Sequence, residues 1–196
     1  YCILTSAATI NVGSIDADET ITIEAAFTFD IADDAPDMYG VSLQANIEGS
    51  SKELWESNIN FNIYAPVPEF GDYFIDDSDG DNNGRLDAGE TVDIVIQTMN
   101  NGHAATYEGE VFASTSSAFL TVNTTNIDVE AIDAEGMQEV TINITAEDNT
   151  PVGTVVDISL EYIAGNYSDT KLVQEAVGLI LEDFETGDFN PDKWDS

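Results

Sequence analysis

The chain has 196 residues, of which 39 are acidic and 4 are basic, and its formal net charge at pH 7 is −35. So few basic residues cannot neutralise phosphates, which excludes nucleic acid and anionic membrane surfaces as partners. Hydrophobic residues make up 42% of the chain, enough for one or two domains with buried cores. No run approaches 18 apolar residues, so the sequence predicts no membrane insertion.

The acidity also bears on stability. A surface that carries so much charge of one sign repels itself, so bound cations or salt should stabilise the folded state. A saline habitat or a simple need for solubility would give the same composition, and the sequence does not separate these explanations.

The cysteine count and the chain ends indicate the context of the chain. The one cysteine, Cys2, excludes an internal disulfide, so any partner of Cys2 would lie outside this chain. Residues 1–4 lack the basic region that opens a signal peptide. Because the chain begins and ends abruptly, we expect it to be a piece of a larger protein.

The first third of the chain contains strand signals separated by turns. Three segments alternate apolar and polar residues with a period of two, at 20–29, 41–47 and 54–64. In the first of them one face would carry Ile21, Ile23, Ala25, Phe27 and Phe29. We expect each segment to form a strand with one buried face.

An acidic loop follows at Asp79–Glu90 and fits the twelve-residue calcium template D-x-[DN]-x-[DN]-G-x5-E at every specified position. Gly84 stands where the backbone of such a loop turns sharply. The predicted ligands, one of them a backbone carbonyl at the arginine, are Asp79, Asp81, Asn83, Arg85, Asp87 and Glu90. These oxygens match the six to eight hard ligands that Ca²⁺ takes, with Glu90 closing the site bidentately.

The acidic residues allow other assignments. A register that starts at Asp77 fails, because it puts Asn82 and Ala88 at the positions of the glycine and the glutamate. An acidic surface turn without metal is the plain alternative. A second calcium site is a weaker possibility at either of two sets, Asp30, Asp33, Asp34 and Asp37, or Asp72, Asp76 and Asp77.

The flanks of the loop indicate that it is not a helical EF-hand. Val92, Ile94 and Ile96 alternate with polar residues after the loop, which predicts a strand. Residues 66–79 before it contain two prolines, a glycine and an acidic run, and we expect a linker there. The loop is therefore predicted to rigidify a junction rather than to open a helical groove.

The remainder of the chain continues the strand pattern. Strands are expected at 92–96, 107–114, 119–122, 127–129, 140–144, 156–162 and 172–181. Short strands at regular spacing without an amphipathic helix are typical of antiparallel β-sandwiches, so we predict an all-β fold.

An internal repeat divides the chain. Residues 10–19 resemble residues 127–136, and each is followed by a similar series of strands and turns. Residues 1–66 match only the later part of the second unit, from about Phe119 onward. The counterparts of the calcium loop and of the two strands after it would lie before Tyr1. We therefore expect 1–66 to be the C-terminal part of one sandwich and 67–181 to be a complete second one.

The run Asn83–Asp93 (NGRLDAGETVD), followed by a strand and Asn100-Asn101-Gly102, resembles the NGRLDPGETV…NTG opening of immunoglobulin-like modules. Those modules occur in tandem in large secreted and surface proteins of Bacteroidetes-type bacteria, next to gingipain-like cysteine peptidase domains and adhesin jelly rolls. Ala88 stands where those modules usually have proline, and this replacement should not disturb the predicted calcium ligands. The tail, 182–196, resembles the opening strand of such a jelly roll, although a frayed tail is equally consistent.

No catalytic group stands out in the sequence. His103, the only histidine, follows a turn signal, and no third group is apparent that would orient a pair with Cys2. The carboxylates are spread over outward positions and loops rather than paired as in a glycosidase. Trp55, Tyr73 and Trp194 could line a sugar platform, although Trp55 fits a core position better. We expect this region not to be an enzyme.

Together these observations predict tandem immunoglobulin-like β-sandwiches, the first incomplete, with an EF-hand-like loop holding Ca²⁺ at the junction. The resemblance implies a secreted or cell-surface location, where the region would act as a spacer between neighbouring domains of the same polypeptide. The alternatives are an adhesin or other module that binds an extracellular protein or glycan, and an accessory domain that stabilises an attached peptidase.

Overall fold

The computed structural model describes residues 1–179, and these form an all-β protein of two compact units, Tyr1–Ala65 and Pro66 onward. Among residues 1–179 there is no helix, and so none long and apolar enough to cross a membrane. The expected start of a further domain at 182–196 lies outside the described residues.

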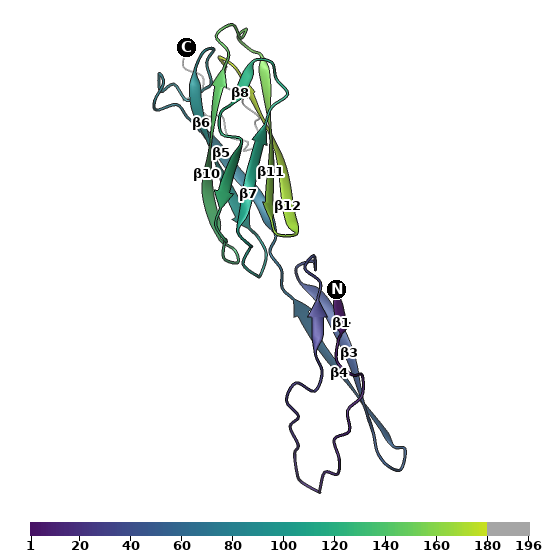
Figure 1. Cartoon of the computed structure of the whole chain (residues 1–196). Coiled ribbons are helices and arrows are strands. Elements are labelled where there is room, and N and C mark those ends of the chain that lie inside the picture. The colour runs from purple at the N-terminus through teal and green to yellow at the C-terminus, as the bar shows by residue number, and fades with distance from the viewer. Residues whose placement is uncertain (180–196) are drawn as a thin grey trace, which may run out of the picture. The chain divides into compact units, whose positions relative to one another are not determined.

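Unit 2, from Pro66 onward, is a β-sandwich of two antiparallel sheets (Figure 1). The strands of the first sheet, in spatial order, are β5 (Pro68–Asp76), β6 (Thr91–Asn100), β10 (Met137–Ala146) and β8 (Leu120–Val122). Those of the second are β12 (Tyr167–Ala176), β11 (Val155–Ala164), β7 (Gly109–Ser114) and β9 (Asn126–Val129). The antiparallel sandwich predicted from the strand pattern is confirmed for this unit.

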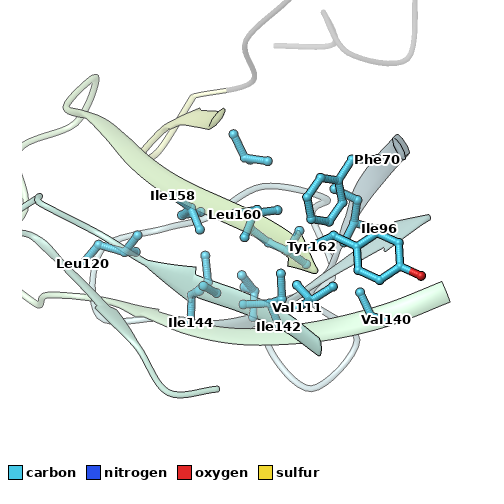
Figure 2. Packing of buried hydrophobic residues seen from close by; sticks show 14 of the residues in the cluster. Phe70, Ile96, Val111, Leu120, Val140, Ile142, Ile144, Ile158, Leu160 and Tyr162 are labelled. Carbon is cyan, nitrogen blue, oxygen red and sulfur yellow. The ribbon is translucent and has the colours of Figure 1, made fainter. Parts of the chain in front are cut away.

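The core of unit 2 lies between the sheets because the central strands alternate strictly. On β6 and β10 the inward residues face one another in register, with Ile94 opposite Ile142 and Ile96 opposite Val140. Ile158 on β11 belongs to the same buried cluster, and Figure 2 shows how it packs with Ile96, Val140 and Ile142. Burying a branched aliphatic side chain of this size contributes about 1.5–3 kcal/mol each, so the core is the main stabilising term.

The segment before the acidic loop is a strand, and the expected linker at 66–79 is wrong. Pro68 and Gly71 suggested a linker, but both stand where an edge strand tolerates them. Pro68 is the first residue of β5, and Gly71 lies at a register shift between Phe70 and Tyr73. A Cβ on Gly71 would lie 2.6 Å from the Met99 sulfur, so any other residue there would require side chains of β6 to shift.

Side chains of β12 close one side of the sandwich against β5. Lys171 Nζ donates to the Gly71 carbonyl at 2.6 Å and lies 5.8 Å from the centre of the Tyr73 ring. The Tyr73 hydroxyl donates to Glu175 Oε1 at 2.9 Å, and the Phe70 amide donates to Asp169 Oδ2 at 2.8 Å. These bonds join the two sheets at an edge where they share no backbone ladder.

Unit 1 contains two small two-stranded sheets. They pair β1 (Cys2–Leu4) with β2 (Phe29–Ile31), and β3 (Tyr39–Glu48) with β4 (Leu54–Ile63). Its buried hydrophobic cluster is small, consisting of Ala35, Val41 and Ile63 with Cys2 and Leu43 packed against them. The strand expected at 20–29 is wrong except at its last residue, since 20–28 are irregular. Alternation is present in that segment, but within this unit only β1 offers it a pairing partner.

Asn100 at the end of β6 is a buried polar hub. Its Nδ2 donates to the carbonyls of Ala104, Ile132 and Asp133 at 2.8–3.1 Å. Its Oδ1 accepts from the amides of Val67 and Gly102, at 3.0 and 3.1 Å. One fully buried amide therefore holds the entrance of unit 2 and the turns at the ends of β6 and β9.

Replacing this hub, Asn100→Ala, should strongly destabilise unit 2. It leaves several buried backbone groups without partners, and we expect the free energy of unfolding to fall by about 3–5 kcal/mol. Urea unfolding measures this loss. The adjacent Asn101 is exposed, so Asn101→Ala is the matched control and should change the unfolding free energy by less than about 0.5 kcal/mol. Equal effects of the two changes would contradict the role of Asn100.

Tyr162 is the largest fully buried side chain of the core. Its hydroxyl has no hydrogen-bond partner of normal geometry within residues 1–179. Burial raises the pKa of Tyr162 above the ordinary 10.0, and the nearby Thr106 side chain offsets part of that rise. The folded protein therefore favours the neutral phenol. Below pH 10 the phenol is neutral in both the folded and the unfolded protein, and the free energy of unfolding keeps its full value. At higher pH the phenol ionises first in the unfolded protein, so the free energy of unfolding falls.

We expect Tyr162→Phe to be nearly neutral at about pH 8, within about 1 kcal/mol, because the lost hydroxyl made no good hydrogen bond. At about pH 10.5 the wild type should lose more stability than the variant, which has no phenol to ionise at this position. Denaturant unfolding at the two pH values measures the difference. Parallel losses in both proteins would contradict the raised pKa.

Candidate metal site

The acidic loop connects β5 to β6 within unit 2, and β5 separates it from the boundary between Ala65 and Pro66. The expected position of the loop at the junction of the two domains is therefore wrong. The loop is anchored by the core and by backbone hydrogen bonds. Leu86, in the middle of the loop, is 1% exposed and belongs to the core cluster. The Gly89 amide donates to the Ala146 carbonyl at 3.1 Å, and the Ala146 amide donates to the Glu90 carbonyl at 2.9 Å. The Gly178 amide donates to the Leu86 carbonyl at 2.7 Å. The core and β10 therefore fix where the acidic side chains lie.

Three carboxylates of this region converge, those of Asp77, Asp81 and Glu90. One oxygen of each lies within 4.8 Å of the others, and among residues 1–179 this is the group of acidic, histidine or cysteine side chains that could hold a metal ion. Asp81 and Glu90 are two of the six predicted ligands. Asp77 is the third member of this acidic triad, although the template spacing excludes it.

Asp77 is the most buried member of the triad, with 4% of its surface exposed. Its Oδ2 accepts from the amides of Asn83 and Gly84 at 2.7 and 3.0 Å, and its carbonyl accepts from the Gly80 amide at 2.7 Å. A buried carboxylate must be compensated in this way. One residue at the end of β5 therefore organises the first half of the loop.

A sequence signal for Asp77 exists in the strand that precedes it. Tyr73 and Ile75 pack against the core from β5, and Asp77 is the next residue of the same parity. Continuing the period of two points its side chain inward. The calcium template misses this residue because its spacing describes loops that are entered from a helix, whereas this loop is entered from a strand.

Glu90 folds back across the loop from its far end. Its Oε2 accepts from the Asp87 amide at 2.9 Å and its Oε1 from the Asp81 amide at 3.4 Å. A Cβ on Gly80 would lie 2.1 Å from Glu90 Oε1, so only glycine permits this approach. Glu90 is thereby brought next to residues that precede it by about ten positions.

The other predicted ligands lie beside the triad or away from it. Asn83 Nδ2 donates to Asp87 Oδ2 at 2.7 Å, and Asn83 Oδ1 accepts from the Arg85 amide at 3.1 Å. The Arg85 guanidinium forms an ion pair with Asp87 at 3.0 Å. Asp79 is exposed and is not part of the triad.

The donor set of the triad fits a hard cation. All of its ligand atoms are carboxylate oxygens, which suit Ca²⁺, Mg²⁺ or Mn²⁺ and not soft metals. Without a cation the three charges repel one another at short range. Asp76 adds a further negative charge, since hydrogen bonds from the Ser78 side chain and from its amide lower the pKa of Asp76. The triad alone does not distinguish calcium from other hard cations.

Neither set considered for a second calcium site comes together among residues 1–179. Asp77 joins the triad without Asp72 and Asp76, and the acidic residues at 30–37 form no such group. In unit 1, Asp37 accepts from the Ala65 amide at 2.9 Å, so it has a structural role. Of the three possible platform aromatics, Tyr73 is engaged with Glu175 and Lys171. Trp55 is 56% exposed on β4 of unit 1, so the core position expected for it is wrong. Trp194 lies outside the described residues. His103 is exposed in the loop after β6.

The triad makes a charge test possible. Asp77→Asn keeps the shape and an acceptor oxygen but removes one of three converging charges. In a chelator we expect its free energy of unfolding to equal or exceed that of the wild type, by up to about 1 kcal/mol. With a saturating divalent cation it should be lower than that of the wild type. Asp79→Asn makes the same charge change outside the triad and should change stability little in either buffer. Identical behaviour of the two variants would contradict the assignment of Asp77.

Comparison with known proteins adds no assignment to this geometry. The sequence matches no protein-family model, and no curated protein matches it. The chemistry of the site is therefore argued from its own residues.

Proposed function

We propose that this region is a non-catalytic, calcium-stabilised spacer in a large secreted or cell-surface bacterial protein. The single observation that carries the proposal is the convergence of Asp77, Asp81 and Glu90 in an anchored loop at one end of a β-sandwich. The resemblance of Asn83–Asp93 to the opening of bacterial immunoglobulin-like modules supports the location and the role. The partners of a spacer are neighbouring domains of the same polypeptide.

Strand order supports an immunoglobulin-like fold for unit 2. The sheet β5-β6-β10-β8 corresponds to strands A-B-E-D of the immunoglobulin sandwich, and β12-β11-β7-β9 corresponds to G-F-C with an added edge strand. One departure concerns the edges. The chain visits β8 in the first sheet before β9 in the second, so it crosses between the sheets three times on its way from β7 to β10.

Several features favour Ca²⁺ over Mg²⁺ as the cation. Calcium accepts many carboxylate oxygens in flexible geometry, whereas magnesium demands a near-ideal octahedron and retains several waters. Two members of the triad, Asp81 and Glu90, also occupy ligand positions of the calcium template. The triad would hold the ion. The backbone amides of Asn83 and Asp87 donate to triad carboxylates, and the side chains of these two residues carry further oxygens in the same loop.

The residues of the loop explain what cation binding would change. Asp77 and Glu90 lie at the two ends of the loop, and Asp81 lies between them in sequence. The repulsion among these three carboxylates opposes closure of the loop. A bound cation removes that repulsion, and its binding free energy adds to the folding free energy. The result is a stiffer β5–β6 connection at extracellular calcium concentrations.

The proposal predicts a calcium-dependent melting temperature. At a free calcium concentration of 100 times Kd, binding contributes about 2.7 kcal/mol, which raises the melting temperature of a unit of this size by about 10 °C. Thermal unfolding of the wild type in calcium and in chelator measures the shift. Asp81→Ala/Glu90→Ala should abolish it. Absence of a shift in the wild type would refute the calcium site, and an equal shift with magnesium would refute its selectivity for calcium.

A further inference from the structure

The internal repeat extends to the pairing of strands. In unit 1, β1 pairs with β2 over three residues, as β8 pairs with the end of β10 in unit 2. The long hairpin β3–β4 corresponds to the hairpin β11–β12, with ten registered pairs in each. The strands of unit 2 that have no counterpart in the described unit 1 are β5, β6, β7 and β9.

Unit 1 is irregular at the counterparts of β9 and of most of β10, the segments of unit 2 whose backbone pairs only with β7 or β6. Most of β10 pairs only with β6, and its counterpart at 22–28 is not a strand. The strand β9 pairs with β7, and its counterpart at 9–12 is not a strand either. Figure 1 draws residues 5–28 as one long loop. Val12, the counterpart of the buried Val129, is 41% exposed. Segments with strand patterns therefore lack partners in this unit.

The hairpin β3–β4 has an apolar face that unit 1 covers only near Val41 and Ile63. The pair Ile47 and Trp55 is 62% and 56% exposed, and Ile59 is 52% exposed. The opposite face is polar, with Ser42, Gln44, Asn46, Asn58, Asn60 and Asn62. In unit 2 the corresponding residues of β11, which include Ile158 and Tyr162, are fully buried by the facing sheet. A two-stranded hairpin with an open apolar face is only marginally stable.

We propose that unit 1 is completed by two further strands equivalent to β6 and β7. One pairs along residues 22–28 and continues the sheet of β1 and β2. The other pairs along the free edge of β3, over Leu43–Glu48, as β7 pairs along the equivalent edge of β11. The apolar sides of the added strands cover the face that carries Ile47, Trp55 and Ile59. This mode of recognition is strand addition, in which backbone pairing gives affinity and alternating side chains give fit.

The occupant is a segment of the same polypeptide joined to the N-terminal side of Tyr1. In unit 2, β6 and β7 come directly before β8, and only residues 115–119 connect β7 to β8. Since β1 is the counterpart of β8, the same short connection would deliver the two strands in cis. A second copy of the chain is disfavoured, because its own β6 and β7 are each paired on both edges. Two copies, each with a formal charge of −35, also repel each other.

Grafting tests this proposal. Residues 91–118, which contain β6 and β7 without the acidic loop, are fused in front of Tyr1 of the full chain. Hydrogen exchange should slow at least tenfold at residues 22–28 and 43–48 relative to the unextended chain. With Trp194→Phe in both proteins, the emission of Trp55 should shift to the blue. The matched control carries Ile94→Asp and Ile96→Asp in the added copy only and should show neither change.

Each other outcome overturns the proposal. Unchanged exchange in the extended chain means that the free edges do not accept these strands. Slow exchange of 22–28 in a monomer of the unextended chain means that unit 1 closes on itself. Slow exchange that appears only with a sedimenting dimer means that a second copy is the occupant. All readouts lie in unit 1, so they are independent of whether the acidic triad binds calcium.

Discussion

Pairing between the central strands is the interaction on which the rest of this structure depends. β6 and β10 pair over nine residues, and that ladder places Ile94 and Ile142 opposite each other in the core. The same strand β10 holds the end of the acidic loop through the backbone bonds of Ala146. Because an unpaired strand leaves its backbone groups without partners, apolar alternation alone does not make a strand. The contrast between the two units, which carry similar patterns and differ in available partners, illustrates this requirement.

The acidic loop likewise depends on the strands and the core that hold it. Its charges would repel in any chain, but here Leu86 is held in the core and Asp77 continues the inner face of β5. The carboxylates are therefore held close together by packing that they do not themselves provide. A glycine at position 80 removes the one steric obstacle to Glu90. The site combines a rigid support with ligands of one chemical type, which is the arrangement that selects a hard cation.

Much of the fold could be predicted from the period of two, and its failures have physical causes. The strands at 92–96, 140–144 and 156–162 lie inside β6, β10 and β11, because their alternating residues meet partners on both sides. The segment 20–28 has the same pattern, but the sequence does not reveal whether a partner is at hand. Pro68 and Gly71 suggested a linker because the low strand propensity of proline and glycine does not apply to edge strands and β-bulges, where both residues are tolerated. The template found Asp81 and Glu90 but not Asp77, whose position follows from strand geometry rather than from loop spacing.

The scarcity of basic residues has a consequence for digestion by trypsin-like proteases, which cleave after lysine or arginine. The chain offers them four positions, and one, Lys193, lies outside the described residues. Lys171 sits within the paired strand β12, and Lys52 in the tip of the β3–β4 hairpin. In unit 2 the remaining bond is Arg85–Leu86, inside the acidic loop, where Leu86 is buried and Arg85 is held by Asp87. Among the described residues of unit 2, the order of this one short loop thus decides whether such a protease can cut the chain between strands.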